Sequence, residues 1–264
     1  MKKLFLALFS LVTSGLSAQS FEGTIQWSMT MEYADPAMKA KMENAQRRMQ
    51  DPAMQAKMKE MQQRMNDPQM KAIMESNPQM KAQMEKAMTG DVGNVLPTGM
   101  KMKVKGASTI TTMEGGMSLK DEVLFIHDKD LIVMLDRTAK TYRTLSSGNT
   151  PRGSNAVKVT KTAETMKVLN FNCTKYVAEV TEKNSKITQT FWTTQEIKDI
   201  NFQSFAKQRM SQGGSMYPEG LEGVPLRIEM QTQEGRMIME VTSIKRETHD
   251  ALLFTLPPDY RELK

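Results

Sequence analysis

The stretch FEGTIQWSMTMEY, residues 21–33, alternates between polar and apolar side chains. Its odd positions from Ile25 to Met31 are apolar, whereas threonine, glutamine and serine occupy the even positions between them. Successive side chains of a β-strand point to opposite faces of a sheet, so a period of two predicts a strand with one buried face. We expect the odd positions to carry that face, with the amphipathic Tyr33 at its end.

A methionine-rich repeat, residues 35–88, follows this strand. Its first two units are DPAMKAKMENAQRRMQ and DPAMQAKMKEMQQRMN, and its apolar residues are methionine and alanine, with Ile73 as the exception. Asp-Pro or Asn-Pro pairs begin at positions 35, 51, 67 and 77. Asp and Asn are good helix N-caps, proline suits the first helical position, and the residue before proline resists helical geometry. We therefore predict three or four short helices, inserted over residues 35–90.

The methionines of this repeat recur at helical spacing, which places them on one stripe of the predicted helices. Methionine fills irregular gaps, so the stripe is compatible with packing on the sheet or on sister helices. It is equally compatible with an adaptable surface for a hydrophobic partner. Pairs at i and i+4 would also suit Cu(I), which prefers soft sulfur ligands, and exposed methionines can serve as sacrificial oxidation sites. The stripe comprises Met38, Met42, Met49, Met54, Met58, Met61, Met65, Met70, Met74, Met80, Met84 and Met88.

The strand pattern returns after position 99. Short β-prone runs are separated by Gly, Asp and Asn, and the last four are FNCTKYVAEVTEKN, SKITQTFWTT, VPLRIEMQTQEG and RMIMEVTSIKRE. The pairs Lys183-Asn184 and Glu234-Gly235 indicate turns, and residues 195–212 are predicted to form a helix or helical turn. Strands, a helical insertion and then many consecutive strands favour an α+β protein with one large curved antiparallel sheet.

The first twenty residues, MKKLFLALFSLVTSGLSAQS, have the three parts of a secretory signal peptide: two lysines, an apolar segment and small residues before the cut. We predict cleavage after Ala18, so that residues 1–18 are the signal peptide and residues 19–264 form a single exported β-rich domain. The destination is the periplasm or the extracellular space. No later apolar run is long enough to span a membrane, although peripheral contact with one is left open.

Composition and motifs argue against several functions. The chain has 36 Lys and Arg against 30 Asp and Glu, without a basic stripe interleaved with aromatics, so nucleic acid is not expected as a partner. The two histidines, His127 and His249, have no partners at metal-ligand spacing, and no catalytic motif is present. Cys173 is the only cysteine, which excludes an intramolecular disulfide and favours a small buried side chain. We expect no enzyme activity, no cofactor and no metal ligands of the His, Cys or carboxylate type.

Four C-terminal segments carry a resemblance. NFNCTKYVAEV, FWTTQEI, EGVPLRIEM and FTLPPDY together resemble an uncharacterised family of exported bacterial proteins, akin to GLPGLI-type proteins and more remotely to the LolA/LolB lipoprotein carriers. The resemblance covers residues 21–33 and 97–260, and departs from the pattern at Asn170-Phe171, where Gly-Tyr is usual. The Asx-Pro-x-Met units of the repeat are also similar to STI1-type co-chaperone repeats, which bind hydrophobic segments.

The LolA-like resemblance implies an unclosed β-barrel whose concave face is covered by helices and holds acyl chains. On this basis we expect a non-enzymatic exported protein that binds a hydrophobic ligand such as a lipid, an acyl chain or a hydrophobic peptide. The alternative is a methionine-rich Cu(I)-binding or structural protein of the cell envelope. On the sheet, Ile132 is expected on the ligand-binding face together with the site residues. The predicted site comprises Trp27, Met29, Met31, Met38, Met42, Met54, Met58, Met61, Met65, Met70, Met74, Phe125, Met134, Trp192, Met237 and Met239.

Overall fold

The computed structural model describes most of the chain. The described residues are 20–65, 77, 97–115, 122–145, 157–182, 185–200, 202, 217–218, 220–232 and 234–263. The predicted signal peptide lies outside these ranges and stays a prediction, as does the division of the chain into residues 1–18 and 19–264. The third and fourth units of the methionine-rich repeat also lie outside them, apart from Asn77.

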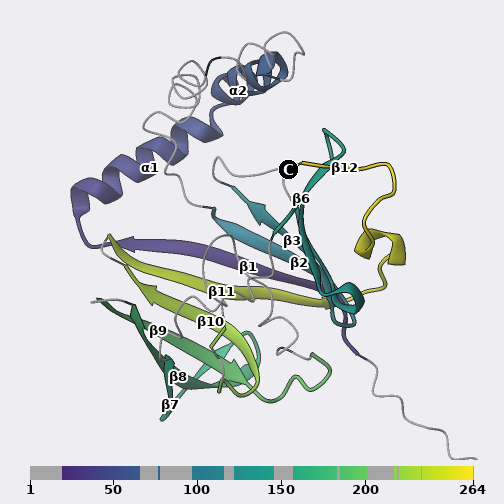
Figure 1. Ribbon diagram of the computed structural model, residues 1–264. Helices are drawn as coiled ribbons and strands as arrows, with labels where there is room; N and C mark the ends of the chain where they lie inside the picture. The colour runs from purple at the N-terminus through teal and green to yellow at the C-terminus, as the bar shows by residue number, and fades with distance from the viewer. Residues whose placement is uncertain are drawn as a thin grey trace, which may run out of the picture.

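The described strands form one twelve-stranded, strongly curved sheet (Figure 1). Its spatial order is β12-β6-β5-β4-β3-β2-β1-β11-β10-β9-β8-β7, and only the pairing of β12 with β6 is parallel. The prediction of one large curved antiparallel sheet is therefore confirmed. The strands are β1 Glu22–Tyr33, β2 Gly99–Lys105, β3 Ser108–Glu114, β4 Glu122–Ile126, β5 Leu131–Asp136, β6 Thr141–Thr144, β7 Val157–Val168, β8 Phe171–Glu182, β9 Ser185–Thr194, β10 Val224–Gln231, β11 Gly235–Arg246 and β12 Arg261–Glu262.

Strand β1 lies in the middle of the sheet, between β2 and β11. Its pairing with β11 runs from Gly23 opposite Arg246 to Tyr33 opposite Gly235, with an irregularity between Gln26 and Trp27. From β1 the sheet continues in two directions, through β2–β6 on one side and through β11 back to β7 on the other. The first strand of the chain therefore joins the two halves of the sheet.

The two faces of the sheet bury different clusters. We define the inner face as the one that carries Ile25, Trp27 and Met29, which are 3%, 4% and 8% exposed. Fully burying such a side chain contributes about 1.5–3 kcal/mol. On the opposite, outer face, residues of β3, β4 and β5 form a second cluster, which Phe254 of the 3₁₀ helix η3 (Ala251–Phe254) covers. A second 3₁₀ turn, η2 (His127–Lys129), links β4 and β5.

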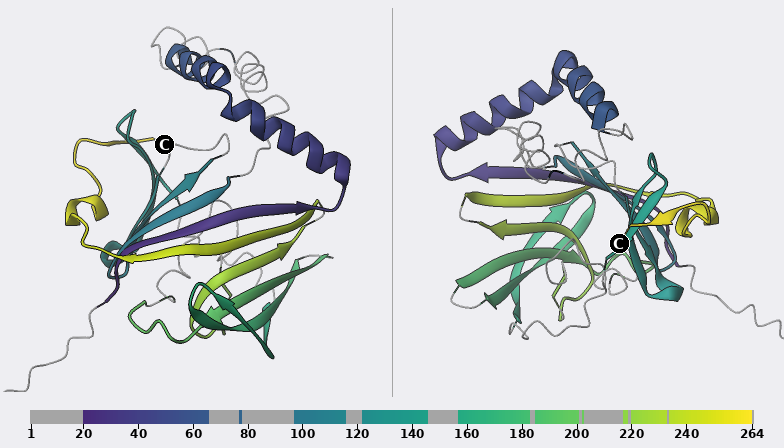
Figure 2. Two further views of the ribbon diagram at one scale, coloured as in Figure 1. Left: turned by 180° about the vertical axis from the view of Figure 1, so that it is seen from behind. Right: turned by 45° about the horizontal axis from the view of Figure 1, so that its top comes forward.

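The helices α1 (Pro36–Gln50) and α2 (Pro52–Met65) begin at prolines, as the Asp-Pro pairs predict. The carboxylate of Asp35 accepts a hydrogen bond from the Ala37 amide at 2.8 Å, and Asp51 accepts one from Ala53 at the same distance. In Figures 1 and 2, α1 starts where β1 ends and turns back beyond the rim of the sheet, with α2 at an angle to it. Within the described ranges, no helix has the length and apolar character needed to cross a bilayer.

The predicted helix over residues 195–212 is wrong for residues 195–200, which are not helical. The Asp199 carbonyl accepts a hydrogen bond from the Phe21 amide at 3.0 Å, and the Asp199 carboxylate pairs with Arg246. Ile197 and Ile200 are buried in the inner-face cluster. Bonds to distant strands replace the local bonds of a helix here, so tertiary contacts override the local pattern. Of residues 201–212, only Phe202 is described; it is helical and packs edge-on against Tyr217.

Gly235, in the predicted Glu234-Gly235 turn, allows a close approach of β11 to β1. Its φ is +149°, and a Cβ atom there would overlap the carbonyl oxygen of Glu32. We expect Gly235→Ala to lower the free energy of unfolding by roughly 2–4 kcal/mol, because backbone strain and overlap add. Chemical denaturation measures this change. As a control, Gly106→Asn, at a φ of +62° with open space around it, should change the stability by less than about 1 kcal/mol. Equal effects would contradict this account.

Candidate functional site

Methionines gather on the inner face at the end of the sheet where β1 ends and β2 begins. Three neighbouring strands place Met31, Met237 and Met230 directly opposite one another, in the order β1, β11, β10. In the next inner-face row, Met29 lies opposite Met239. We call the seven methionines of this end the methionine rim: Met29, Met31, Met100, Met113, Met230, Met237 and Met239.

The methionine rim changes from buried to accessible toward the end of the strands. Met29, Met100 and Met239 are 8%, 1% and 1% exposed and belong to the inner-face cluster. Met31, Met113, Met230 and Met237 are only half-buried. The apolar inner face therefore continues without interruption to side chains that solvent, or another molecule, can reach.

The inner face also holds an unsatisfied polar group. Among the described residues, the indole nitrogen Nε1 of Trp27 has no hydrogen-bond partner, although the side chain is 4% exposed. A buried donor without an acceptor costs stability, so such groups are rare in folded proteins. Trp27 lies opposite Met100 on one side and Val241 on the other, next to the methionine rim.

The structure places most of the predicted sheet residues on the inner face. Successive strand pairings connect Met134 through Val123, Thr111 and Met102 to Ile25, which puts all five on one face. Phe125 and Ile132 lie opposite each other on this same face and are buried. Trp27, Met29, Met31, Met237 and Met239 belong there as well.

The prediction that Trp192 shares this face is wrong. Phe191 pairs with Ile228 and Tyr176 on the inner face and is fully buried, so the next residue points outward. Phe191 and Trp192 are consecutive aromatic residues, and either of them could occupy the buried face of an alternating strand. The sequence pattern therefore did not determine which one points inward. Sequence reasoning also missed Met100, Met113 and Met230, although Met100 begins the alternating run MKMKVK.

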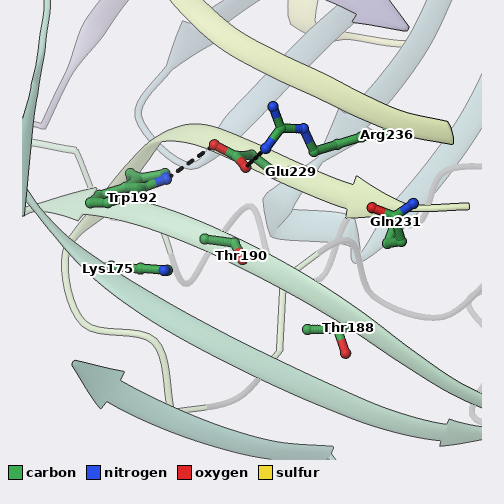
Figure 3. Close-up of a pocket in the computed structure, with 7 residues that line it drawn as sticks. All are labelled: Lys175, Thr188, Thr190, Trp192, Glu229, Gln231 and Arg236. Atoms are coloured by element: carbon green, nitrogen blue, oxygen red, sulfur yellow. Dashed lines mark hydrogen bonds and ion pairs between the residues drawn. The ribbon is translucent and has the colours of Figure 1, made fainter. Parts of the chain in front are cut away.

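On the outer face, Trp192 lines an open depression of about 560 Å³ (Figure 3). Its indole donates a hydrogen bond to Glu229 at 3.3 Å, and Glu229 also pairs with Arg227 at 2.7 Å and with Arg236 at 3.3 Å. The ammonium group of Lys175 lies 5.7 Å from the Trp192 ring. These polar groups bind one another, which makes the depression a poor site for an apolar ligand. The lining residues are Lys175, Thr188, Thr190, Trp192, Glu229, Gln231 and Arg236.

The helix methionines are only partly described. Met38 is 37% exposed, and Met42 and Met54 are half-buried. The side chains of Met58, Met61 and Met65 lie outside the described part, as do residues 66–76, which include Met70 and Met74. The structure therefore brings the sheet methionines together and leaves the grouping of the helix methionines a prediction.

The cysteine and histidine side chains of the described ranges lie apart from one another and are held by packing or hydrogen bonds. Cys173 is fully buried, and burial raises the pKa of its thiol to about 11. His249 contacts the Thr24 hydroxyl at 3.3 Å, and His127 packs edge-on against Phe125. Within these ranges, no group of three His, Cys, Asp or Glu side chains could hold a metal ion.

The comparisons with known proteins give a family. The family described as a domain of unknown function, DUF4412, matches residues 79–260, and the chain belongs to it. The match begins inside the methionine-rich repeat and ends just before β12. No curated protein matches the chain.

Two solved structures are similar in shape. The lipoprotein LppX of Mycobacterium tuberculosis has 8% identity and a TM-score of 0.34, over 86% of this chain and 89% of LppX. LprF of Mycobacterium bovis has 9% identity and a TM-score of 0.28, over 62% of this chain and 83% of LprF.

We expect the Cys173 thiol to be unreactive in the folded protein. The thiolate is the reactive form, and the raised pKa of Cys173 keeps the thiol protonated at neutral pH. Burial also keeps the reagent away from the sulfur atom. Labelling with iodoacetamide should be negligible in buffer. It should increase with denaturant in parallel with the change in tryptophan fluorescence that marks unfolding. Since Cys173 is the only cysteine, the label reports on this site alone. Rapid labelling without denaturant would contradict the buried, structural role.

Proposed function

We propose that this protein is a non-enzymatic carrier that binds a hydrophobic molecule on the inner face of its sheet. The observation that carries this proposal is the continuous apolar path from the buried Trp27 to the half-exposed Met31, Met230 and Met237. Methionine side chains have several accessible shapes at little cost, so such a surface can adapt to ligands that differ in form. A lipid, an acyl chain or a hydrophobic peptide has this chemistry.

The polar anchor in this proposal is Trp27. Its unpartnered indole N–H would donate a hydrogen bond to a carbonyl or carboxylate oxygen of the ligand. Fatty acids, lipid esters and peptides all carry such an oxygen at one end of an apolar segment. The ligand would then orient its acceptor toward Trp27 and its apolar part toward the methionine rim.

The helices α1 and α2 would cover the ligand in this arrangement. Helix α1 begins at Pro36, three residues after Tyr33, at the end of the sheet that carries the methionine rim. The sheet would then act as the LolA-like unclosed barrel that the C-terminal motifs imply, and the methionine-rich helices as its adaptable cover. The predicted signal peptide, residues 1–18, supports a role outside the cytoplasm.

A substitution pair on β1 tests which face binds the ligand. Met31→Glu puts a charge on the inner face, where an apolar ligand would strip it of water, and should weaken binding at least about tenfold. Thr30→Glu puts the same charge on the exposed outer face one residue away and should leave binding unchanged. Titration with a fluorescent fatty acid measures both dissociation constants. Equal affinities for the two variants would contradict binding on the inner face.

Deleting residues 35–88 tests the role of the helices. The two apolar clusters of the described residues contain no side chain from α1 or α2, so we expect the shortened protein to unfold cooperatively. Its melting temperature should change by no more than about 4 °C, which corresponds to about 1 kcal/mol in a domain of this size. Affinity for the fatty acid should fall, because the cover is lost.

Two outcomes of this deletion would contradict the proposal. Loss of cooperative unfolding, measured by circular dichroism, would show that the repeat belongs to the core. Unchanged affinity in a folded protein would show that the helices do not cover the ligand. Native mass spectrometry of the full-length protein from its own host complements the deletion, since a hydrophobic ligand that copurifies identifies the cargo directly.

A further inference from the structure

The outermost row of the methionine rim places three thioethers side by side, and the amide of Gln189 comes next in the row, opposite Met230. Met230 lies opposite Met237, and Met237 lies opposite Met31, so three adjacent strands each contribute one methionine in direct register. We call these three residues the methionine row. Directly paired residues of antiparallel strands have Cβ atoms about 4.5–5.5 Å apart. Methionine has three rotatable side-chain bonds, so three neighbouring sulfur atoms on a curved sheet can turn toward one point.

The methionine row is accessible on one side and closed on the other. Its three side chains are half-buried, whereas Met29 and Met239, in the row behind it, are buried. An ion could therefore approach from the rim and would meet an apolar floor. This combination of access and a dry floor favours ligands that need no water in their coordination shell.

The carboxylates of these strands point to the other face. Glu32 and Arg236 alternate with the methionines along β1 and β11, so they point outward, where they pair with each other at 2.7 Å. Glu229 likewise precedes Met230 and bonds to Arg227 and Arg236 on the outer face. Hard cations such as Ca²⁺ and Mg²⁺ bind six or more oxygen ligands, with carboxylates among them. The oxygen groups that strand pairing puts beside the row are the neutral amide of Gln189, opposite Met230, and the phenol of Tyr33. Neutral thioethers select soft ions, of which Cu(I) is the biological example.

We propose that Met31, Met230 and Met237 form a three-thioether site for Cu(I) at the rim of the sheet. The site shares its three side chains with the hydrophobic surface proposed above, but it rests on their sulfur atoms and not on their apolar surface. It also gives a reason for methionine at positions where leucine would pack equally well. Thioethers do not titrate, so the affinity for Cu(I) should be constant between about pH 5 and 8. A histidine ligand would change its protonation state over this range, and the affinity would then depend on pH.

Leucine substitutions test whether the sulfur atoms bind the ion. The variant Met31→Leu/Met230→Leu/Met237→Leu removes the three sulfur atoms and keeps apolar side chains of similar volume, a change that folded cores tolerate. The matched control, Met38→Leu/Met42→Leu/Met54→Leu, removes three methionines of the helices. Competition for Cu(I) against a chromophoric chelator, without oxygen and with a reductant, measures the affinity of each full-length protein.

We expect the wild-type protein and the helix variant to bind one Cu(I) with a submicromolar dissociation constant. The sheet variant should bind at least about 100-fold more weakly, because loss of direct ligands costs no less than loss of their supporting groups. X-ray absorption of the bound copper should show sulfur neighbours only. The circular dichroism spectrum and melting temperature of the sheet variant should match those of the wild-type protein, which shows that the loss of copper binding is not a loss of the fold.

Three results would overturn the metal site. The first is wild-type affinity no better than micromolar, and the second is unchanged affinity in the sheet variant. The third is loss of copper binding in the helix variant but not in the sheet variant, which would place the ion on the helices. Weaker fatty-acid binding by Met31→Glu would support the hydrophobic site. Submicromolar Cu(I) affinity of the wild-type protein, lost in the sheet variant, would support the metal site.

Discussion

The pairing of β1 with both β2 and β11 is the constraint on which the structure depends. β11 comes near the end of the chain, so closing this pair requires ordering almost all of the intervening sequence. Burial of the inner face of this central strand offsets that entropy cost, since Ile25, Trp27 and Met29 belong to the main apolar cluster. Gly235 permits the close approach at one end of this pair, and the ion pair of Arg246 with Asp199 ties the other end to the segment that covers the inner face.

The central position of β1 also explains where the methionine-rich repeat is attached. A repeat inserted between β1 and β2 interrupts a connection between neighbouring antiparallel strands, so it can be long without changing the order of the sheet. The chain leaves the sheet at Tyr33 and re-enters it at Gly99, both at the end that holds the methionine rim. The repeat and this end of the sheet are both rich in methionine, whose adaptability would suit the proposed surface for hydrophobic ligands.

The two faces of the sheet carry side chains of different chemistry. Charged residues on the outer face of β8–β11 satisfy one another, as the bonds of Glu229 to Trp192, Arg227 and Arg236 show. Within the described residues, the inner face holds mainly apolar side chains and thioethers, together with three polar groups without a partner: the indole of Trp27 and the hydroxyls of Thr111 and Thr193. Because alternation sends adjacent residues to opposite faces, a short strand such as β10 serves a salt-bridge network with Glu229 and an apolar surface with Met230.

The sequence by itself determined the strands, the capped helix starts and the face on which β1 is buried, because these follow from local periodicity and from the chemistry of Asx-Pro pairs. It also indicated the buried state of Cys173. Only the tertiary structure decided the partner of each strand, the non-helical path of residues 195–200 and the outward position of Trp192. Strand register and long-range hydrogen bonds set these features, and neither leaves a local pattern. The alignment of Met31, Met237 and Met230 belongs to the same class: three residues from three strands become neighbours only when the sheet assembles.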